Sequence, residues 1–462
     1  MSSFSRNNGT HTHRSARAAG RPRARVRSQR GNHLNPPGAA RRPRGTAADD
    51  GQTLLSRRKF LYGAAGVGAI ALVAGGIKVA TSNSKKKSRQ IASLNVPEGS
   101  VKTLDNFELV EDHSAHLRQI GSFDLPLGSL VFASDDAVAA CLVPSDTGSP
   151  LARVGIVEIG KAGGPVTVIE KPVGLSEHFE IYDVRASSAG IVWTEANILD
   201  GTWRIYTASL AGTKAGSPVL AASGDASTDT PTLAASESFA FWLVNPKAVD
   251  KVVKGSCALY ACSFGSDDPE KIHTAHKNAA TPLYAAANGV SFAARSAENP
   301  THFELLYFGS ASREREDSVV LPAGMTPLSV AYGPQGFSFS LERIYDSGEG
   351  LSQMGTYCPM GDTRKDDYDA ALWFRFGRTP SAPPCWCGKL LVVKSTYAVA
   401  LVDLESGTYF TIDVDDGADT YGEYTATTGA HSKLVTFTSV DYKPVNEERT
   451  QVCRVKIWSP AN

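Results

Sequence analysis

Two histidine pairs in this 462-residue chain have a spacing that occurs in metal sites. His113 and His116 are three residues apart, and so are His273 and His276. On an extended strand, residues three apart point to opposite faces, so either pair would need a turn to bring its imidazoles together. No third ligand accompanies either pair in the sequence. We therefore interpret these histidines as surface residues and predict no metal at them.

A cluster of carboxylates lies near the C-terminus, where Asp413, Asp415, Asp416 and Asp419 surround Gly417. Oxygen donors around a glycine turn are typical of calcium loops. The cluster lacks the bidentate glutamate that an EF-hand supplies twelve residues along its loop. We predict an acidic hairpin turn and no cofactor here, with a bound calcium ion as the alternative.

Seven cysteines could form disulfides, bind a metal or lie buried as free thiols. They are Cys141, Cys257, Cys262, Cys358, Cys385, Cys387 and Cys453, an odd number that leaves at least one unpaired. Cys257 and Cys262 are five residues apart on one predicted strand, so they point to opposite faces and a bridge between them would break the strand. Cys385 and Cys387 could bind a metal or pair with Cys358. We favour thiols buried in strands.

The motifs of several enzyme classes are missing from the sequence. It contains no G-x-S-x-G nucleophile elbow, no H-E-x-x-H zinc motif, no phosphate-binding loop and no dinucleotide-binding fingerprint. The sequence therefore gives no support to an acyl hydrolase, a zinc protease or an NTPase.

The equal numbers of basic and acidic residues, 47 each, conceal a division of charge along the chain. Residues 1–90 hold nineteen of the basic residues but only two acidic ones, so residues 91–462 carry a formal net charge of −17. Residues 1–55 are rich in Arg, Gly, Pro, Ser and Asn, and such a segment cannot bury enough apolar surface to fold. We expect a disordered, solvated arm. It lacks aromatic residues among its arginines, which argues against nucleic-acid binding.

A twin arginine stands directly before an apolar run that extends from residue 60 to residue 77. The residues Ser56, Arg57, Arg58, Phe60 and Leu61 resemble the Tat consensus, a signal that is read before folded cargo is exported. The resemblance implies that the Tat translocon recognises these five residues. The excess of basic residues before the run predicts a cytoplasmic N-terminus and an extracytoplasmic C-terminal part.

The apolar run at 60–77 could span a membrane as a single anchor. Cleavage would require small residues at −1 and −3, and the natural site at Ala80 has Lys78 at −3. We therefore favour an uncleaved, single-pass protein of the cell membrane. The alternative is cleavage of the signal and secretion.

From residue 126 onward the chain repeats about every fifty residues, which indicates propeller blades in a strand-rich sequence. A Thr-Pro pair followed by a short apolar strand begins at residues 230, 281 and 326. A turn and a second apolar strand come next, and the turns mark seven units at Asp136, Gly190, Ser238, Gly289, Gly336, Gly388 and Ser432. The sequence predicts an all-β, seven-bladed β-propeller, with six or eight blades as alternatives.

The seventh unit stops after its third strand, so another segment must cover the open strand edge. Residues 107–112 read Phe-Glu-Leu-Val-Glu-Asp, and we predict that they close the ring. The expected organisation is a disordered cytoplasmic arm at 1–55, a signal and anchor at 56–78, a linker at 79–103 and a propeller at 104–462.

The repeats resemble the WD40-like or TolB-like propeller family. Ser187 to Gly190 form a serine-rich turn before a strand, and a hydrophobic-Tyr pair opens the following strand at Ile205-Tyr206, Leu259-Tyr260 and Leu306-Tyr307. The resemblance covers roughly residues 126–462 and implies the fold. Every copy departs from the family's usual Ser-Pro-Asp-Gly turn, so the resemblance implies no partner and no activity. The whole chain looks like a Tat-exported propeller protein.

Loops on a rigid scaffold usually carry binding, so we place the candidate ligand contacts between second and third strands. These contacts are Asp146, Asp200, Lys247, Asp250, Asp346, Glu349, Asp441 and Glu447. We predict a binding or scaffolding module for an envelope protein or a glycan.

The alternative is an exported glycan hydrolase or lyase with carboxylates around the propeller channel. A cofactor-dependent oxidoreductase is a third interpretation, which no ligand motif supports. An enzyme would gather acids or histidines at the channel mouth, whereas a scaffold would show an apolar patch on one face.

Overall fold

The structure, a computed structural model, describes residues 101–321, 325–341, 356–359, 373–375, 382–394, 397–442 and 450–461, without the side chains of 341, 356–359 and 442. The predicted arm, the twin-arginine segment with its apolar run, and linker residues 79–100 lie outside these ranges. The described part is all-β, with three short 3-10 helices: η2 (Leu104–Asn106), η3 (His113–Ala115) and η4 (Leu175–Glu177). It includes no helix long and apolar enough to cross a bilayer.

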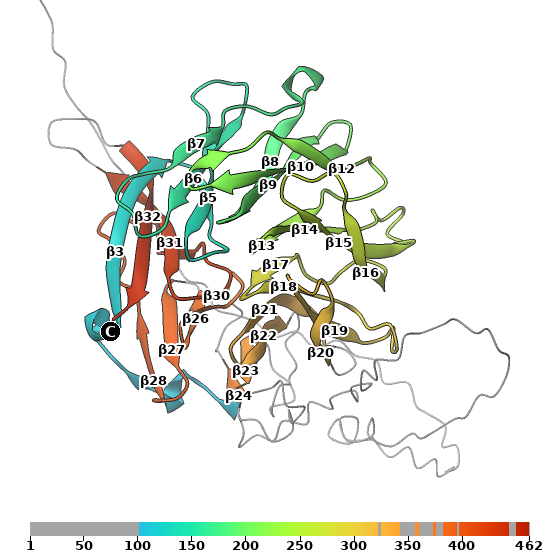
Figure 1. Ribbon diagram of the computed structural model, residues 1–462. Coiled ribbons are helices and arrows are strands. Elements are labelled where there is room, and N and C mark those ends of the chain that lie inside the picture. The colour runs from blue at the N-terminus through green and yellow to red at the C-terminus, as the bar shows by residue number, and fades with distance from the viewer. Residues whose placement is uncertain are drawn as a thin grey trace, which may run out of the picture. The chain divides into compact units, whose positions relative to one another are not determined.

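The described strands form seven sheets, which we number in chain order (Figure 1). Sheet 1 contains β4 (Leu130–Phe132), β5 (Val138–Pro144), β6 (Ala152–Glu158) and β7 (Val166–Ile169). Sheet 2 contains β8 (Glu180–Ser187), β9 (Gly190–Asn197), β10 (Thr202–Ala211), β11 (Lys214–Ala215) and β12 (Val219–Gly224). Sheet 3 contains β13 (Thr232–Ser236), β14 (Phe239–Val244), β15 (Ser256–Ser263) and β16 (Glu270–His276).

The remaining four sheets follow the same order of strands from the inside of the ring outward. Sheet 4 contains β17 (Tyr284–Ala286), β18 (Gly289–Arg295), β19 (Phe303–Gly309) and β20 (Arg315–Val320). Sheet 5 contains β21 (Pro327–Gly333), β22 (Gly336–Leu341), β23 (Thr356–Pro359), β24 (Trp373–Arg375) and β1 (Val101–Lys102). Sheet 6 contains β30 (Gly429–His431), β25 (Cys385–Cys387), β26 (Leu390–Lys394), β27 (Val399–Asp403), β28 (Thr408–Thr411) and β2 (Glu108–Leu109). Sheet 7 contains β29 (Tyr424–Thr425), β31 (Leu434–Tyr442), β32 (Thr450–Pro460) and β3 (Leu117–Pro126).

A cluster of buried apolar side chains fills each junction between neighbouring sheets. The junction that closes the circle lies between sheets 7 and 1, where Leu125 and Val455 pack with Val131 and Cys141. Each sheet therefore packs against the next one, and the last sheet packs against the first. This closed arrangement of antiparallel sheets is a β-propeller.

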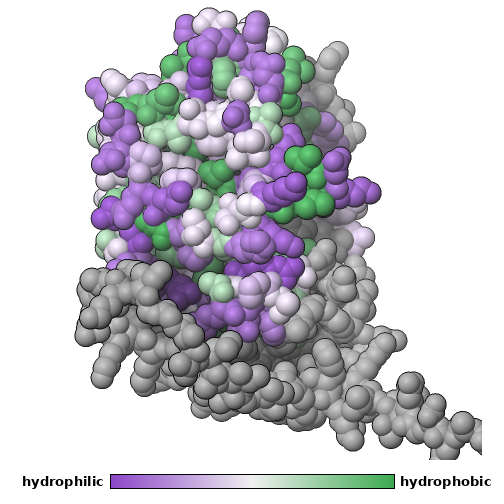
Figure 2. All heavy atoms as spheres, turned by 90° about the vertical axis from the view of Figure 1, so that its right-hand side faces the viewer, coloured by the Kyte–Doolittle hydropathy of each residue, from purple (hydrophilic) through white to green (hydrophobic). Residues whose placement is uncertain are grey.

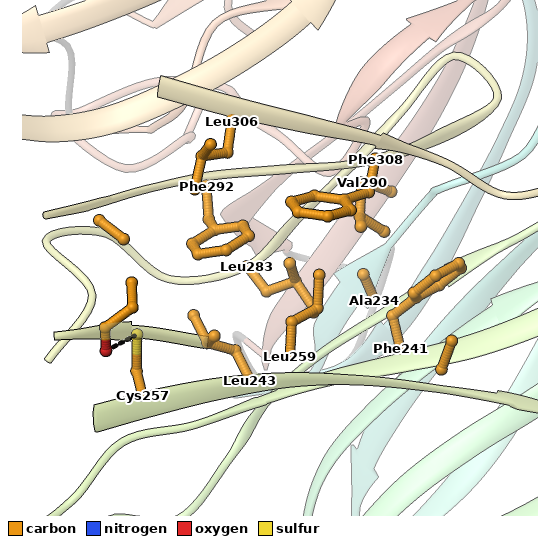
Figure 3. Close-up of a cluster of buried hydrophobic side chains, with 14 residues drawn as sticks. Ala234, Phe241, Leu243, Cys257, Leu259, Leu283, Val290, Phe292, Leu306 and Phe308 are labelled. Carbon is orange, nitrogen blue, oxygen red and sulfur yellow. Dashed lines mark hydrogen bonds between the residues drawn. The ribbon is translucent and has the colours of Figure 1, made fainter. Parts of the chain in front are cut away.

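The junction between sheets 3 and 4 shows how alternating sequence builds this core (Figure 3). Cys257 and Leu259 of β15 point toward sheet 4, where they join a cluster that contains Phe292. Cys262 of the same strand belongs to the cluster on the other side, facing sheet 2. The prediction that Cys257 and Cys262 lie on opposite faces is confirmed, because successive side chains of a strand alternate. The outer surface over β12 and β16 is mostly polar, with small separate apolar patches (Figure 2).

Turns between first and second strands fasten neighbouring sheets together at one end of the ring, which we call the turn end. The carboxylate of Asp136 accepts hydrogen bonds from the backbone N–H groups of Ser432 at 3.0 Å and Lys433 at 2.9 Å, which ties sheet 1 to sheet 7. Asp135 accepts a hydrogen bond from the N–H of Ser188 at 2.8 Å, which ties sheet 1 to sheet 2. Turn positions that mark the repeat in the sequence therefore also hold the ring together.

The strand that completes sheet 7 is β3, which pairs with β32 from Leu117 to Pro126. The prediction that residues 107–112 close the ring is wrong, because β2 in that segment forms a two-residue parallel ladder with β28 of sheet 6. The predicted linker also ends earlier, since β1 pairs with β24 of sheet 5. The physical reason is length: β32 has 11 residues whose backbone groups need partners, and the ten-residue β3 covers them.

A cysteine introduced at Leu125 tests this register, because Leu125 lies directly opposite Cys453. Cross-strand partners have Cβ atoms about 4.5–5.5 Å apart, close to the range that a disulfide bridges. We expect Leu125→Cys to form a disulfide with Cys453 under mild oxidation, measured by peptide mapping. Phe123→Cys is the matched control, since its partner is Val455 and it should not crosslink. Crosslinking by the control alone would contradict the register.

Candidate functional site

The loops between second and third strands lie at the end of the ring opposite the turn end, because successive strands of each sheet run in opposite directions. The connections from each sheet to the next lie there too, and we call this end the loop end. Of the eight predicted ligand contacts, Asp346, Glu349 and Glu447 lie outside the described residues. The other five belong to loop-end hairpins of sheets 1, 2, 3 and 7.

These five residues are held by local contacts. Asp146 Oδ2 lies 3.7 Å from Arg153 Nη2 across its own hairpin. Asp200 accepts a hydrogen bond from Asn197 at 2.8 Å, Asp441 accepts one from Gln451 at 2.8 Å, and the N–H of Lys247 donates to Ser227 O at 2.9 Å. Asp250 occupies a hairpin turn with φ of +51°. Within the described residues these contacts stay inside one hairpin or reach the adjacent connection, so they do not assemble a shared site.

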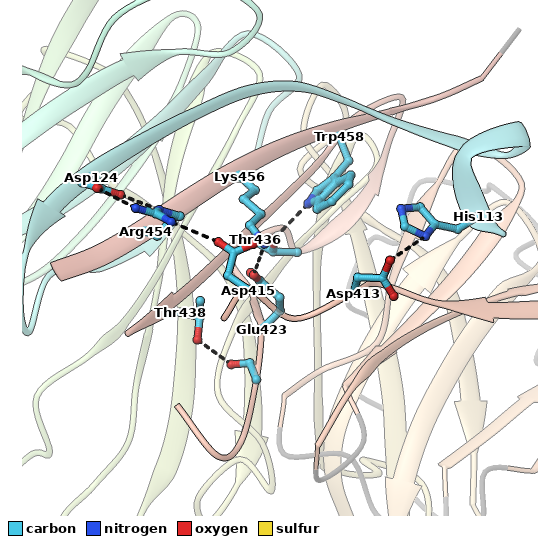
Figure 4. A network of polar contacts seen from close by, with 11 residues as sticks. His113, Asp124, Asp413, Asp415, Glu423, Thr436, Thr438, Arg454, Lys456 and Trp458 are labelled. Carbon is cyan, nitrogen blue, oxygen red and sulfur yellow. Dashed lines mark hydrogen bonds and ion pairs between the residues drawn. The ribbon is translucent and has the colours of Figure 1, made fainter. Parts of the chain in front are cut away.

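The strongest candidate site is a polar groove along the β3–β32 pair, between sheets 6 and 7 (Figure 4). It has two adjoining parts of about 380 Å³ and 340 Å³ that share Gln119, Asp415 and Lys456. The first part is also lined by Asp124 and Arg454. The second part extends along β3 toward η3.

Strand alternation supplies the cationic wall of this groove. Arg454, Lys456 and Trp458 are every second residue of β32 and face sheet 6, whereas Cys453 and Val455 face sheet 1. The pairing of β3 with β32 places an acidic partner opposite one of these cations: Asp124 stands directly across from its arginine.

An ion-pair network crosses the groove (Figure 4). Arg454 donates from Nε and Nη2 to both carboxylate oxygens of Asp124, at 2.8 and 3.0 Å, and Arg454 Nη1 lies 3.3 Å from Asp415 Oδ2. Lys456 Nζ lies 2.7 Å from Asp415 Oδ1 and 2.8 Å from Glu423 Oε1. The paired geometry of the Arg454–Asp124 contact is the strong, directional form of an ion pair.

The ion pairs favour the charged forms of Asp415 and Lys456. Burial opposes the charge on Asp415, but its contacts with Lys456 and Arg454 outweigh burial and hold the pKa of this carboxyl below its ordinary value. Burial also opposes the charge on Lys456, whose side chain is 4% exposed, and the two facing carboxylates outweigh it and raise its pKa. A buried charge is tolerated only when it is paired and hydrogen-bonded, and these residues meet that requirement.

A pair of exposed tyrosines joins the connection that carries Asp415 to the loop between β26 and β27: Tyr421 lies on the connection and Tyr397 on the loop. The rings of Tyr397 and Tyr421 are nearly parallel, 2° apart with centroids 6.2 Å apart, and the two residues are 58% and 51% exposed. Gly422 allows this approach, because a Cβ there would lie 2.6 Å from the carbonyl oxygen of Tyr397. Beneath them the ammonium of the buried Lys394 donates to the carbonyl of Tyr421, and burial lowers the pKa of this lysine.

The prediction of an acidic hairpin turn at 413–419 is wrong, because the segment belongs to the connection from β28 of sheet 6 to β29 of sheet 7. Asp415 faces the two cations of β32, and Asp413 Oδ2 lies 3.8 Å from His113 Nδ1. Among the described residues no group of three His, Cys, Asp or Glu side chains is placed to share a metal ion. His273 is partly buried beside Phe308, 5.1 Å between ring centroids, and burial lowers its pKa to about 4.

The six cysteines with described side chains are buried free thiols. Burial raises the pKa of Cys141 and Cys387 to about 12 and that of Cys453 to about 11. The interpretation of these six as thiols buried in strands is confirmed. The side chain of Cys358 lies outside the described ones.

Inner strands of different sheets approach one another closely around the axis of the ring. Gly429 of β30, at φ +79°, is so close to β17 of sheet 4 that a Cβ would lie 2.8 Å from Ala286 Cα. The backbones of β30 and β17 are therefore in direct contact. Asp183, on the inner strand β8, forms an ion pair with Arg185, whose guanidinium carbon stands 3.8 Å from the ring centroid of Phe132.

Sequence reasoning missed the groove. It selected Asp413, Asp415, Asp416 and Asp419 by their spacing, but the partners of Asp415 on β32, Arg454 and Lys456, are about forty positions away in the chain. A usable signal was the alternation of Arg454, Lys456 and Trp458, since two cations on one face of an otherwise apolar strand require acidic partners.

Removing the central carboxylate should destabilise the fold in a pH-dependent manner. We expect Asp415→Asn to lower the free energy of unfolding at pH 7 by about 1.5–3 kcal/mol, the range for hydrogen bonds to charged groups. Because the folded pKa of Asp415 is depressed, this difference is present above the unfolded pKa of about 3.9 and disappears as the pH falls through the folded pKa. Urea unfolding between pH 7 and 3 measures it, with the exposed Asp413→Asn as the control expected to have little effect. A loss of unfolding free energy that is the same at every pH would contradict the role of Asp415 as a charged member of the ion-pair network.

Thiol titration checks the burial of the cysteines. A thiolate is the reactive form, so raised pKa values and burial should both block labelling. We expect the native protein to react with a thiol reagent at pH 8 at no more than one position, Cys358, and the unfolded protein to react at all seven. Labelling of Cys141 or Cys453 in the native protein, identified by mass spectrometry, would refute this result.

No protein-family model and no curated protein matches the chain. Among solved structures it is similar to the Dos1 propeller, with 11% identity, a TM-score of 0.37 and coverage of 70% of this chain and 75% of that one. It is also similar to prolyl endopeptidases, with 9% identity, a TM-score of 0.44 and coverage of 79% of this chain and 49% of that one. A third similar structure is Pyrococcus horikoshii acylaminoacyl peptidase, with 8% identity, a TM-score of 0.43 and coverage of 70% of this chain and 51% of that one. The match spans about half the length of these peptidases. At such identities and TM-scores the likeness carries no information on activity, substrate or partner.

Proposed function

We propose that this propeller is an extracytoplasmic, membrane-anchored module that binds a neutral glycan in the groove between sheets 6 and 7. The export and anchoring part of the proposal is supported by the twin arginine at 57–58 and the apolar run at 60–77. The binding part is supported by the composition of the groove.

The observation that carries the proposal is the balance of charge in the groove. Its lining contains three carboxylates, Asp124, Asp413 and Asp415, and three cationic side chains, Arg118, Arg454 and Lys456. A strongly charged ligand gains little net attraction from such a lining. A sugar presents neighbouring hydroxyl groups that each donate and accept, so it can meet a carboxylate and a guanidinium at the same time.

The tyrosine pair supplies the second element of sugar recognition. The C–H face of a pyranose ring is apolar and packs on an aromatic ring, while its hydroxyls at the edge stay hydrated. Tyr421 exposes such a ring on the connection that also carries Asp415, and Tyr397 exposes a second one beside it from the loop between β26 and β27. A tyrosine combines an apolar body with a polar tip, which suits a ligand of mixed polarity.

Binding is favoured over glycan hydrolysis by the state of the groove carboxylates. Glycoside hydrolysis requires one carboxylic acid whose pKa is raised so that it can donate a proton. The pKa of Asp415 is shifted the other way by Lys456 and Arg454, and the Asp124 carboxylate is engaged by both nitrogens of the arginine fork. The groove therefore offers acceptors and donors, and it supports the hydrolase alternative less well.

A glycan array followed by calorimetry tests the binding proposal. The full-length protein is kept in a sugar-free zwitterionic detergent, because maltoside detergents would compete for the groove. We expect binding of neutral oligosaccharides, and an affinity about tenfold lower, or about 1.4 kcal/mol, in Tyr397→Ala/Tyr421→Ala. Tyr182→Ala is the matched control, since Tyr182 is a similarly exposed tyrosine of sheet 2. Absence of binding to any glycan would overturn the proposal and favour a protein ligand.

A conservative replacement tests the export signal. We expect Arg57→Lys/Arg58→Lys to leave the protein in the cytoplasm, because lysine keeps the charge but lacks the guanidinium group. Cell fractionation and protease accessibility of the propeller measure the outcome. Arg41→Lys/Arg42→Lys changes another adjacent arginine pair, in the arm, and should be exported normally. Export of both variants at the level of the unmodified chain would refute recognition of the twin arginine.

A further inference from the structure

The exposed apolar side chains of the described residues are gathered at one end of the propeller. Sixteen large apolar residues are exposed, and all except Leu109, Val166 and Leu220 lie in loop-end connections or within three residues of them. Single exposed apolar residues are normal on a protein surface. Their concentration at one end requires another explanation.

The most exposed of these side chains are at the tips of loops in sheets 2 and 3. Ile198 and Leu199, between β9 and β10, are 72% and 96% exposed. Val249 and Val252, between β14 and β15, are 67% and 53% exposed. Leu151 of the hairpin in sheet 1 is also exposed. Three consecutive sheets therefore each present at least one apolar side chain.

The valines of sheet 3 stand at the base of a tight turn. Each of them donates its N–H to the carbonyl of the other, Val249 to Val252 at 3.0 Å and Val252 to Val249 at 2.9 Å. The two residues between them, Asp250 and Lys251, have φ of +51° and +64°. Positive φ is uncommon for residues other than glycine, so this two-residue turn holds its tip in one conformation.

Basic residues surround this hairpin. Within the hairpin, the exposed Lys247, Lys251 and Lys254 outnumber one acid, Asp250, while Asp225 and Asp229 are exposed on the connection beside it. Lysines around projecting apolar side chains are typical of surfaces that enter the interface of an anionic bilayer, where the chains insert and the ammonium groups meet lipid phosphates.

The arrangement suits a lipid surface better than a protein partner. A protein interface needs a contiguous packed patch, whereas these side chains project singly from separate loops with polar residues between them. A lipid interface accepts each tip independently. Residues 79–100, which precede β1, could span at most about 70–80 Å, enough for the loop end to reach a membrane that holds the run at 60–77.

We propose that the loop end of sheets 1 to 3 docks on an anionic membrane surface, with Ile198, Leu199, Val249 and Val252 inserted into the interface. This docking goes beyond the glycan-binding proposal and does not depend on the groove, but it rests on the proposed export and membrane anchor. It predicts that the propeller rests on the bilayer through one of its two ends.

A fluorescent label at the loop tip tests the docking in the full chain. The six described native thiols are buried, so Leu199→Cys offers an accessible site for an environment-sensitive dye. Lys214→Cys is the matched control, because Lys214 is exposed in the same sheet but at the turn end. The Cys358→Ser background removes the remaining cysteine from both proteins. Each labelled protein is reconstituted into vesicles with and without phosphatidylglycerol that contain a lipid quencher.

We expect the dye at position 199 to shift to the blue and to be quenched about threefold more strongly than the dye at position 214 in anionic vesicles. This difference should decrease in neutral vesicles and in Lys247→Gln/Lys251→Gln/Lys254→Gln. Equal, water-like emission at both positions in a chain that floats with the vesicles would overturn the docking and leave the anchor intact. A chain that does not float would overturn both the anchor and the docking. A shift seen only when membrane proteins are added would assign the loop end to a protein partner.

Discussion

The pairing of β3 with β32 is the interaction on which the rest of the structure depends. A ring of sheets is stable only when its first and last members pack together, and an uncovered strand edge exposes unpaired backbone groups. Antiparallel pairing along β3 covers that edge and brings Leu125 into the junction with sheet 1. The same pairing places Asp124 against Arg454 and forms one wall of the groove. The pairing of β3 with β32 therefore both closes the ring and forms one wall of the candidate site.

The charged network beside this ladder carries a free-energy cost that its pairing offsets. Lys456 and Glu423 are almost completely removed from water, and an unpaired charge in that position would be strongly destabilising. The two residues at the centre of the network each have two opposite charges within 4 Å: Asp415 has two cations and Lys456 has two carboxylates. Such a network fixes the positions of donors and acceptors before any ligand arrives, which lowers the entropy lost on binding.

The two ends of the ring differ in construction, and the difference suits a binding module. At the turn end, hydrogen bonds between turns tie neighbouring sheets, as in the contacts of Asp136 with Ser432 and Lys433. At the loop end, hairpins project side chains such as Leu199 into solvent. A rigid end supports a variable one, so the loops can change their contacts without loss of the fold.

Sequence alone determined the all-β propeller, because a fifty-residue period, alternating strands and turn residues are local patterns that repeat along the chain. It also placed Cys257 and Cys262 on opposite faces and predicted buried thiols. It could not identify the closing strand: residues 107–112 are as strand-like as Leu117–Pro126, and only competition for the edge of β32 separates them. Nor could it assemble the groove, whose residues come from η3, β3, β32 and the connection at 413–423. Local sequence pattern specifies the strands. Which distant side chains come into contact depends on how the ring closes, because closure buries charged groups that then require ion-pair partners.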